Sequence, residues 1–596
     1  MNDFTGQMLA GNPVILHAMQ PCAILDFPDP SGLRQPLAFY SPRETLIAES
    51  AEQVRGVIRR AESYAQNGAW VVGFVSYEAA PAFDSRFAVQ RVNGDFPFAW
   101  FSVFDTAKPY MPEAPDHTTC ATWSPDVERE TYESDIAAIR HAIHEGEVYQ
   151  VNHTLRLHSS CQGSGISLFN DLRNAQPRSY AAYLDLGRWK VLSVSPELFF
   201  RLEKDAIATR PMKGTIRRGR FPAEDMIMAE KLRSSEKDRA ENLMIVDLIR
   251  NDLSRIALPN SVKVQELFSV ETHPTVHQMT STVTARTRSG IRLDDVFAAL
   301  FPCGSVTGAP KMKAMEIIAR LEKTPRDIYC GAIGLLQPGG NATFNVAIRT
   351  VLLDETDRTA TCGVGGGIVW DSTHEGEFSE AVLKSKFLAG KEEEFSLIET
   401  MRLEEGNYAR LDYHVARLAA SARYFNRPFD DGQCIARLQE FAENCGKSAH
   451  RIRMTLDSAG RFGIESSALP ENPPFHPRFA LSEFPVSRDN IWLFHKTTKR
   501  ELYEHAIASF PDAFDVLLWN EQGELTEFTK GNIVLDVDGL HLTPPIECGL
   551  LDGCLRREMI DHGEITEARL TLADLERAEH IWFINSLRGR IEVFRS

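Results

Sequence analysis

The sequence predicts an α+β protein made of two parts that fold separately. Apolar residues recur every three or four positions in some segments and alternate with polar residues in others, so helices and strands are interspersed. The composition is typical of globular proteins, with 43% hydrophobic and 25% charged residues. A helical pattern ends at Ala389-Gly390, and a charged stretch follows it. We therefore predict one domain over residues 1–389 and a second over residues 394–596.

The bulk properties exclude several classes of protein. A net charge of −17 argues against a protein that binds nucleic acid or an anionic membrane, since either would need a basic face. No apolar run approaches the ~20 residues that span a bilayer, and the N-terminus does not have the pattern of a signal peptide. Ten scattered cysteines without a Cys-x-x-Cys pair indicate neither a disulfide framework nor zinc. We expect a cytoplasmic protein with reduced thiols.

The elements of the first part can be predicted in order along the chain. Ile136, Ile139 and Ile143 form one stripe of a helix over 126–145, which Gly146 ends. The pattern predicts a strand over 148–155 and one helical stretch over 223–255. A loop over 302–310 precedes a helix that ends near 321. Three strands follow, over 328–336, 343–353 and 360–370, and a helix over 376–388 closes the first part.

In the second part, Val415, Leu418, Ala422 and Phe425 face inward on a helix over 412–425. Strands are expected at 514–519 and 531–537, and another helix begins at Asp552-Gly553.

Two acidic pairs, Asp238 with Glu241 and Glu377 with Glu380, each lie three residues apart in a predicted helix. This spacing places both carboxylates of a pair on one helix face. Four carboxylates converging from two helices would suit Mg²⁺, which prefers oxygen ligands. Such pairs are more often only a solvated helix face, so the spacing alone does not decide between the two interpretations.

Several ordered motifs surround these pairs. They are Gly146-Glu147-Val148-Tyr149-Gln150-Val151-Asn152, Ser195-Pro196-Glu197-Leu198-Phe199, Pro211-Met212-Lys213-Gly214-Thr215, Asp238-Arg239-Ala240-Glu241-Asn242, Gly304-Ser305-Val306-Thr307-Gly308-Ala309-Pro310-Lys311, Tyr329-Cys330-Gly331, Asn345-Val346-Ala347-Ile348-Arg349-Thr350 and Gly365-Gly366-Gly367. With these motifs, residues 120–388 resemble the chorismate-utilising enzymes. The resemblance implies a β-sandwich with surrounding helices and a dicarboxylate substrate on a cyclohexadiene ring.

The resemblance also implies roles for individual residues. Glu241 and Glu380, supported by Asp238 and Glu377, would hold Mg²⁺. Substrate contacts would come from Arg349, Lys384, Tyr329, Gly366, Gly367, Thr307 and Gly308. Lys213 would attack ring carbon C2 while the C4 hydroxyl leaves, Glu197 would be the general acid/base, and His277 matches a family position near the ring.

Lys213 separates the members of this family. Anthranilate synthases carry Ala at this position, whereas aminodeoxychorismate synthases, isochorismate synthases and salicylate synthases carry Lys. The chain has no Gly-x-Cys-x-Gly turn for glutamine hydrolysis. Ammonia would therefore come from a separate glutamine amidotransferase subunit or from free ammonium.

A second set of motifs begins after residue 395. It comprises His414 and Arg417, Lys496-Thr497-Thr498-Lys499-Arg500, Leu525-Thr526-Glu527-Phe528-Thr529-Lys530-Gly531-Asn532, Gly549-Leu550-Leu551-Asp552-Gly553-Cys554-Leu555-Arg556 and Asn585-Ser586-Leu587-Arg588-Gly589. Gly553 at a helix start offers free backbone N–H groups that suit a phosphate. In this order the motifs resemble the two-lobed fold-type IV pyridoxal-phosphate enzymes.

The resemblance implies that Lys496 holds pyridoxal 5′-phosphate covalently and that Glu527 pairs with its pyridine nitrogen. Arg417 and the amides of Cys554 and Leu555 would bind the phosphate, with Ser586 near the cofactor. Many relatives carry Thr where this chain has Leu555, so one hydroxyl donor is missing. Enzymes of this type usually dimerise, so a homodimer through the second domain is expected.

Taken together, the two resemblances imply amination of chorismate to aminodeoxychorismate, followed by a lyase reaction that releases pyruvate and 4-aminobenzoate for folate synthesis. The attachment of the two domains, not the second set of motifs, favours a lyase over a transaminase. One alternative pairs isochorismate- or salicylate-type chemistry with an aminotransferase. Another is that one half is a non-catalytic binding module.

Overall fold

The computed structural model describes residues 20–29, 31–90, 95–112, 118–389, 394–471 and 474–596. The chain forms two compact units, and neither is continuous in sequence. The first contains Met1–Thr215, Leu232–His273 and Gln278–Lys391, and the second contains Ile216–Lys231, Pro274–His277 and Glu392–Ser596. The predicted seam at Gly390–Glu393 lies outside the described residues. Among the described residues, no helix is both long enough and apolar enough to span a membrane.

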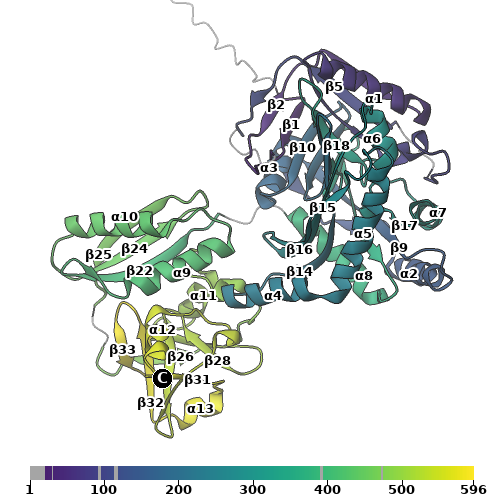
Figure 1. Cartoon of the computed structure of the whole chain (residues 1–596). Coiled ribbons are helices and arrows are strands. Elements are labelled where there is room, and N and C mark those ends of the chain that lie inside the picture. The colour runs from purple at the N-terminus through teal and green to yellow at the C-terminus, as the bar shows by residue number, and fades with distance from the viewer. Residues whose placement is uncertain (1–19, 30, 91–94, 113–117, 390–393, 472–473) are drawn as a thin grey trace, which may run out of the picture. The chain divides into compact units, whose positions relative to one another are not determined.

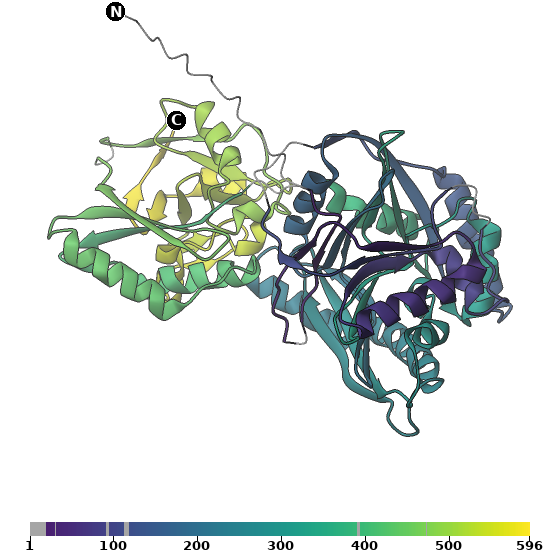
Figure 2. The same ribbon diagram turned by 90° about the horizontal axis from the view of Figure 1, so that it is seen from above.

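Two large sheets form the first unit (Figures 1 and 2). The path of the first sheet is β17 (Gly308–Ala309), β9 (Gln150–Gln162), β21 (Thr359–Ile368), β20 (Thr350–Asp354), β11 (Trp189–Ser195), β10 (Tyr180–Asp185), β1 (Ala23–Asp26), β2 (Leu37–Phe39) and β6 (Lys108–Pro109), with β7 (Thr119–Cys120) and β8 (Ser124–Pro125) pairing with β9. The path of the second is β14 (Met212–Arg217), β16 (Val276–Arg286), β13 (Ala206–Arg210), β12 (Leu198–Glu203), β19 (Ala342–Val346), β18 (Ala332–Leu336), β4 (Trp70–Val75), β5 (Ala99–Phe104) and β3 (Glu44–Ala48), with β15 (Lys263–Thr272) pairing with β16.

The sheets pack face to face, and helices cover their outer faces. Leu25 and Leu184 of the first sheet share one core cluster with Phe74 and Leu335 of the second. A second cluster joins the outer face of the second sheet to α1 (Ala51–Gln66), α5 (Glu236–Ser254) and α6 (Leu293–Leu300). A third joins the first sheet to α2 (Arg129–His144), α3 (Gly165–Ala175), α7 (Lys311–Leu321) and α8 (His374–Lys384). The predicted β-sandwich with surrounding helices is confirmed.

Several predicted elements have different bounds in the structure. The helical stretch 223–255 is two helices, α4 (Pro222–Ser234) and α5, because Ser235 caps α5 by accepting a hydrogen bond from the Asp238 amide at 3.3 Å. The predicted strand 343–353 is also two strands, β19 and β20, which belong to different sheets. Between them Arg349 has φ 48°, a left-handed conformation that strands do not contain.

The expectation that all cysteines are reduced thiols is wrong for one pair. Cys120 and Cys161 form a disulfide, with their Cα atoms 4.2 Å apart. They face each other in the register of β7 and β9, although 41 residues separate them in sequence. The antiparallel pairing of two distant strands, which no local motif reveals, brings them together.

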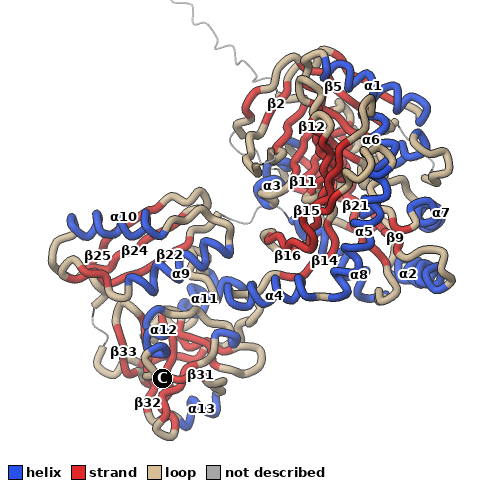
Figure 3. Tube along the Cα trace, in the orientation of Figure 1, coloured by secondary structure: helices blue, strands red, loops and turns tan. Residues whose placement is uncertain are grey.

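The second unit has two lobes, as predicted. In the smaller lobe α9 (Leu411–Tyr424) and α10 (Asp431–Asn444) pack with a sheet of β23 (Asn407–Tyr408), β22 (Leu397–Glu404), β24 (His450–Leu456) and β25 (Phe462–Ala468) (Figure 3). The larger sheet runs through β31 (Thr566–Glu567), β30 (Leu540–Thr543), β29 (Gly531–Val537), β28 (Leu525–Phe528), β27 (Val516–Trp519), β26 (Arg478–Leu481) and β34 (Phe594–Arg595), with β32 (His580–Asn585) and β33 (Gly589–Glu592) attached. Its helices are α11 (Glu501–Ala508), α12 (Cys554–Asp561) and α13 (Leu572–Arg577).

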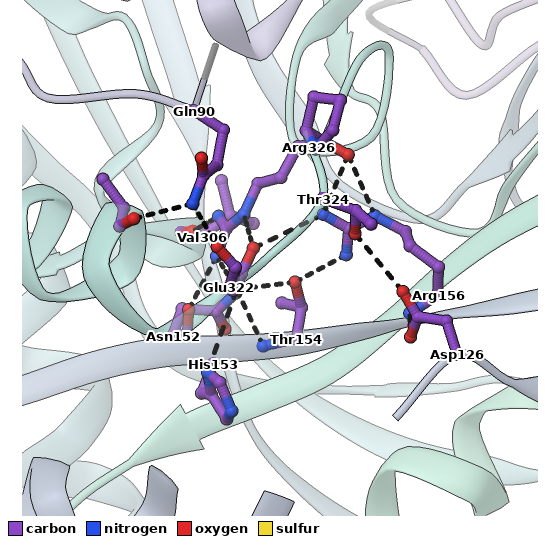
Figure 4. Close-up of polar contacts among 12 residues, drawn as sticks. Gln90, Asp126, Asn152, His153, Thr154, Arg156, Val306, Glu322, Thr324 and Arg326 are labelled. Carbon is purple, nitrogen blue, oxygen red and sulfur yellow. Dashed lines mark hydrogen bonds and ion pairs between the residues drawn. The ribbon is translucent and has the colours of Figure 1, made fainter. Parts of the chain in front are cut away.

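A buried carboxylate ties together the strand and the loop that carry the first site (Figure 4). Glu322, just after α7, receives hydrogen bonds from Arg326 Nη2 at 2.6 Å and from the amide and hydroxyl of Thr154 at 2.9 and 2.8 Å. Arg156 Nη2 lies 3.4 Å from its other oxygen. Arg326 also donates to the carbonyls of Val306 and Asn152, at 2.9 and 2.8 Å. One carboxylate thereby joins α7, β9 and the segment before β17.

Glu322 remains ionised in this setting. Burial alone would raise the pKa of its carboxyl, but the guanidinium groups of Arg326 and Arg156 outweigh burial and lower the pKa to about 2. Removing one partner of such a buried pair leaves an uncompensated charge.

We predict that Glu322→Gln destabilises the protein by about 3–5 kcal/mol, because Arg326 and Arg156 would lose their counter-charge in the interior. Urea unfolding measures the change. The matched control is Glu316→Gln on α7, whose carboxylate is 3.2 Å from Lys313 Nζ on the surface. The control should change stability by less than about 0.5 kcal/mol. Equal midpoints for the two variants would contradict the prediction.

Candidate active sites

Lys213 lies on β14, and its backbone is held from α5. Asn242 Nδ2 donates to the Lys213 carbonyl at 3.3 Å, and Asn242 Oδ1 accepts a hydrogen bond from Ser281 Oγ at 2.5 Å. Asn242 is buried, at 1% exposed. The sequence analysis gave Asn242 no role, although its position in the motif, one residue after Glu241, is the signal that could have identified it.

The Lys213 side chain lies close to the glycines of β21, which have no side chains. A Cβ added to Gly367 would lie 2.4 Å from both Lys213 Nζ and Gln150 Nε2, so a side chain there would displace them. Gln150 is fully buried, and neither its amide nitrogen nor its amide oxygen has a hydrogen-bond partner in the described part of the chain. An unpaired buried amide costs about 1–3 kcal/mol. Gln150 is therefore a candidate ligand contact that the sequence analysis missed.

Burial of Lys213 favours its neutral amine over its charged form. Burial lowers the pKa of Lys213, and the positive charge of Lys384 lowers it further, while Glu241, Glu197 and Glu380 oppose the shift. A neutral amine has the free electron pair that a nucleophile needs.

Glu197 has the environment of a general acid. It is 3% exposed and accepts a hydrogen bond from Ser305 Oγ at 2.7 Å. Burial raises the pKa of Glu197 to about 7, although Ser305 and Lys213 act in the opposite direction. A carboxyl with this pKa can carry a proton near neutral pH and release it.

The predicted metal ligands share one charged neighbourhood. A Cβ on Gly366 would lie 3.3 Å from Glu377 Oε2 and 3.9 Å from Glu380 Oε1. The pKa of Glu241 is raised by burial and by Asp238 and Glu380, against Lys213 and Lys237, and that of Glu377 by burial and Glu380. In Glu380 burial also acts to raise the pKa, but Lys384 Nζ at 2.7 Å outweighs it and lowers the pKa.

These four carboxylates fit a hard divalent cation by donor chemistry and by their mutual repulsion, which a cation would relieve. They are not drawn together to coordination distance. In the part of the chain that the structure describes, the group of three side chains with ligand atoms within 4.8 Å of one another is Glu399, His414 and Cys554, in the second unit. There Arg417 already neutralises Glu399, at 2.6 Å.

The remaining substrate candidates of the first unit differ in their surroundings. Arg349 Nη1 donates to the neutral Gln176 side chain at 2.7 Å, and burial lowers the pKa of Arg349 to about 10. Tyr329 is buried, with its ring 5.4 Å from the Arg156 guanidinium carbon. Thr307 Oγ1 donates to the Cys303 carbonyl at 3.1 Å.

Gly308 and His277 have structural surroundings. A Cβ on Gly308 would come within 2.2 Å of the Gln150 carbonyl, so glycine permits β17 to pair with β9. His277 belongs to the second unit, where its Nε2 lies 2.8 Å from Asp225 Oδ1. A catalytic role for His277 stays a prediction.

In the second unit, Lys496 lies partly buried beside β22. The Ile398 amide donates to its carbonyl at 2.8 Å. Burial lowers the pKa of Lys496 to about 8, assisted by the positive charges of Arg500 and Arg417. Such an amine is accessible in its neutral form near physiological pH, which suits covalent attachment to an aldehyde.

Glu527 lies on β28 among hydrogen-bond donors. Tyr503 Oη donates to it at 2.8 Å and Asn532 Nδ2 lies 3.4 Å away. Burial raises the pKa of Glu527 to about 8. A buried carboxyl with a raised pKa would be stabilised by a cationic donor such as a pyridinium N–H, so the site fits pyridoxal phosphate. A Cβ on Gly553 would lie 2.0 Å from Asn532 Oδ1, which explains glycine before α12.

The predicted phosphate ligands come from three elements. Cys554 and Leu555 begin α12, where the first backbone N–H groups have no partner within the helix. Arg417, on α9, gives Nε and Nη2 to Glu399 at 2.9 and 2.6 Å, and Nη1 to the Asp552 carbonyl at 3.1 Å. Two of its five N–H groups remain for a ligand. Ser586 follows β32.

Two family models match the chain. The family of chorismate binding enzymes matches residues 20–390, and the chain belongs to this family. Its C-terminal part, residues 396–594, matches the class IV aminotransferases.

Among individual relatives, aminodeoxychorismate synthase component 1 of Escherichia coli is 44% identical over 265 residues, covering 44% of this chain and 58% of that protein. Anthranilate synthase component 1 of Aquifex aeolicus is 40% identical over 266 residues, covering 45% and 53%. The chain thus spans less than two thirds of the length of these two relatives. The crystal structure of anthranilate synthase component I from Streptococcus pneumoniae has the same fold, with a TM-score of 0.51 and 23% identity over 65% of this chain and 95% of that one.

We predict that Gly367→Ala lowers chorismate turnover by about 100-fold, because the methyl group displaces Lys213 Nζ and Gln150 Nε2. Gly56→Ala on α1 is the matched control, since a Cβ there meets nothing within 4 Å. Chorismate consumption is measured at saturating ammonium. Equal turnover by the two variants would show that Lys213 tolerates the displacement.

Proposed function

We propose that this chain aminates chorismate to 4-amino-4-deoxychorismate and then eliminates pyruvate from it, giving 4-aminobenzoate for folate synthesis. The observation that carries the proposal is a lysine of lowered pKa in each unit, Lys213 beside the acid Glu197 and Lys496 beside Glu527. We assign the first reaction to residues 1–389 and the second to residues 394–596. Ammonia would come from a glutamine amidotransferase partner, in the cytoplasm, and the second domain would form a homodimer.

In the first reaction the amine of Lys213 bonds to ring carbon C2 as the C4 hydroxyl departs. Glu197 gives its proton to that hydroxyl, which leaves as water. Ammonia then bonds to C4 and Lys213 leaves C2, so the lysine is regenerated. Arg349 pairs with a substrate carboxylate, because its planar guanidinium has N–H groups left beyond the one that Gln176 accepts. Mg²⁺ held by Glu241 and Glu380, with Asp238 and Glu377, would neutralise the ring carboxylate.

In the second reaction pyridoxal phosphate would supply the electron sink. Lys496 would hold the cofactor and would accept the proton that leaves C4 of the substrate. Glu527 would pair with the pyridine nitrogen. The bond from C3 to the enolpyruvyl oxygen breaks, the ring becomes aromatic, and the released enolpyruvate takes up a proton to give pyruvate. Arg417 and the first amides of α12 would bind the phosphate.

The alternative with isochorismate- or salicylate-type chemistry also uses a lysine at position 213. It predicts turnover of chorismate without any ammonia source. The 44% identity with aminodeoxychorismate synthase component 1 of Escherichia coli over 265 residues favours amination over that alternative. The reading of one half as a non-catalytic module is disfavoured because both lysines have lowered pKa values.

The product test incubates the full chain with chorismate, Mg²⁺ and ammonium, with and without pyridoxal phosphate, and identifies products by mass. Native protein should give 4-aminobenzoate, Lys496→Ala should accumulate aminodeoxychorismate, and Lys213→Ala should leave chorismate unchanged. Lys499→Ala, three residues from Lys496, is the control and should behave as native. Anthranilate or salicylate as the product would refute the assignment of the first reaction.

We predict that the first reaction slows above pH about 7, because Glu197 must carry a proton and its raised pKa is about 7. Below this value the acid is present, and above it the rate falls about tenfold per pH unit. Glu197→Gln should lower the rate by about 10²–10⁴-fold and abolish the alkaline limb. An unchanged alkaline limb in Glu197→Gln would assign that limb to another group.

A further inference from the structure

A second buried carboxylate, Glu399, organises the phosphate end of the pyridoxal-phosphate site. Glu399 lies on β22 and is 2% exposed. It accepts two hydrogen bonds from Arg417, at 2.9 and 2.6 Å, and its Oε2 is 2.6 Å from His414 Nδ1. Arg417 and His414 hold the pKa of Glu399 at about 2 against the opposing effect of burial. The carboxylate is therefore ionised and can only accept hydrogen bonds.

This fixes the proton of His414, because Nδ1 must donate to Glu399. In a neutral imidazole the other nitrogen is then an acceptor. His414 Nε2 lies 2.7 Å from Ser586 Oγ, and His414 is 1% exposed. The Ser586 hydroxyl therefore donates to His414, and the chain of donors runs from Ser586 through His414 to Glu399. These three residues come from the turn after β32, from α9 and from β22.

The arrangement conflicts with a phosphate beside Ser586. The serine has one O–H group, which cannot donate to His414 and to a phosphate at the same time. If it turned to the phosphate, His414 Nε2 would be left buried without a donor, at a cost of about 1–3 kcal/mol. The conflict disappears when His414 takes up a proton, since Nε2–H then donates to Ser586 Oγ and the serine proton is free for the phosphate.

The groups that face His414 determine when this happens. Glu399 favours the charged imidazole, whereas burial, Arg417 and Lys496 disfavour it, and together they lower the pKa of His414 in the structure without a ligand. Cys554 Sγ lies 3.4 Å from Nδ1, and burial raises the pKa of that thiol to about 12, so it is uncharged. A phosphate dianion adds negative charge beside this group and favours the imidazolium.

We propose that Glu399 and His414 are positioning residues for the phosphate of the cofactor, and that His414 takes up one proton from solvent when the phosphate binds. Ser586 then donates to the phosphate and accepts from His414. Glu399 holds the imidazolium and the Arg417 guanidinium in place. The inference rests on the proposed pyridoxal-phosphate site and adds to it a proton that binds together with the phosphate.

The test counts protons by titration calorimetry of the full chain without cofactor at pH 8, in buffers of different ionisation enthalpy. The probe is pyridoxine 5′-phosphate, which has no aldehyde and cannot bond to Lys496. At this pH its phosphate is mostly dianionic. Native protein should take up about one proton more than His414→Asn. His562→Asn is the control, because that side chain is 62% exposed, and it should match native protein.

Further variants separate positioning from a merely structural role. Ser586→Ala should bind the probe more weakly and lose the proton uptake while His414 is intact. Glu399→Gln should weaken binding by about tenfold or more. Thermal unfolding of the cofactor-free proteins checks that each variant folds, and Ser586→Ala carries the test if His414→Asn does not.

Equal proton uptake by native protein, His414→Asn and Ser586→Ala would overturn the inference while leaving the cofactor site in place. Absence of any binding by the native chain, together with no visible absorbance on adding pyridoxal phosphate, would refute the proposed site itself. Inorganic phosphate serves as a second probe and should show the same difference between native protein and His414→Asn.

Discussion

The first site depends on the ion pairs and hydrogen bonds that the buried, ionised carboxylate of Glu322 makes. A buried anion is tolerated only when donors surround it, and Glu322 receives them from Arg326, Arg156 and Thr154. The same Arg326 holds the Val306 and Asn152 carbonyls. The segment leading to Thr307 and the strand carrying Gln150 are therefore held by one charge, a rigidity that the proposed reaction at Lys213 would require.

The two lysines have lowered pKa values for different physical reasons. Lys213 is surrounded by carboxylates that favour its charge, so burial has to outweigh Glu241, Glu197 and Glu380. Lys496 has the cations Arg500 and Arg417 as neighbours, and these act in the same direction as burial. Binding a cation or an anion would therefore affect the two amines differently. A metal near Glu241 would neutralise the carboxylates that oppose the lowering of the Lys213 pKa. A phosphate near Arg417 would instead screen a positive charge that helps to lower the Lys496 pKa.

The sequence predicted those features that depend on short spacing. Most elements followed from periodicity, whereas the β-sandwich and the two-lobed second domain were implied by the family resemblances that the ordered motifs carry. The break at Ser235 was missed because a helix cap inside a continuous helical pattern looks like an ordinary polar residue. The strand 343–353 was read as one because the left-handed Arg349 is not a glycine, the residue that signals such a turn.

The hydrogen-bond partners of individual side chains from distant segments could not be predicted from the sequence. His414 and Ser586 are 172 residues apart, and Ser305 and Glu197 are 108 apart. A partial signal existed for Glu399, since it lies on the same face of β22 as the buried Leu397 and Met401, two residues from each. A carboxylate on an apolar strand face implies buried donors, but the sequence does not say which ones.

Arg349 shows how the first site is prepared for an anion. Its guanidinium meets the neutral amide of Gln176, and burial alone lowers its pKa to about 10. Its backbone is also held at φ 48°, a conformation that costs about 1–3 kcal/mol in a residue other than glycine. Both terms destabilise the protein without a ligand. In the proposed reaction a substrate carboxylate would supply the missing counter-charge, and the cost of burying the Arg349 guanidinium would then be offset on binding.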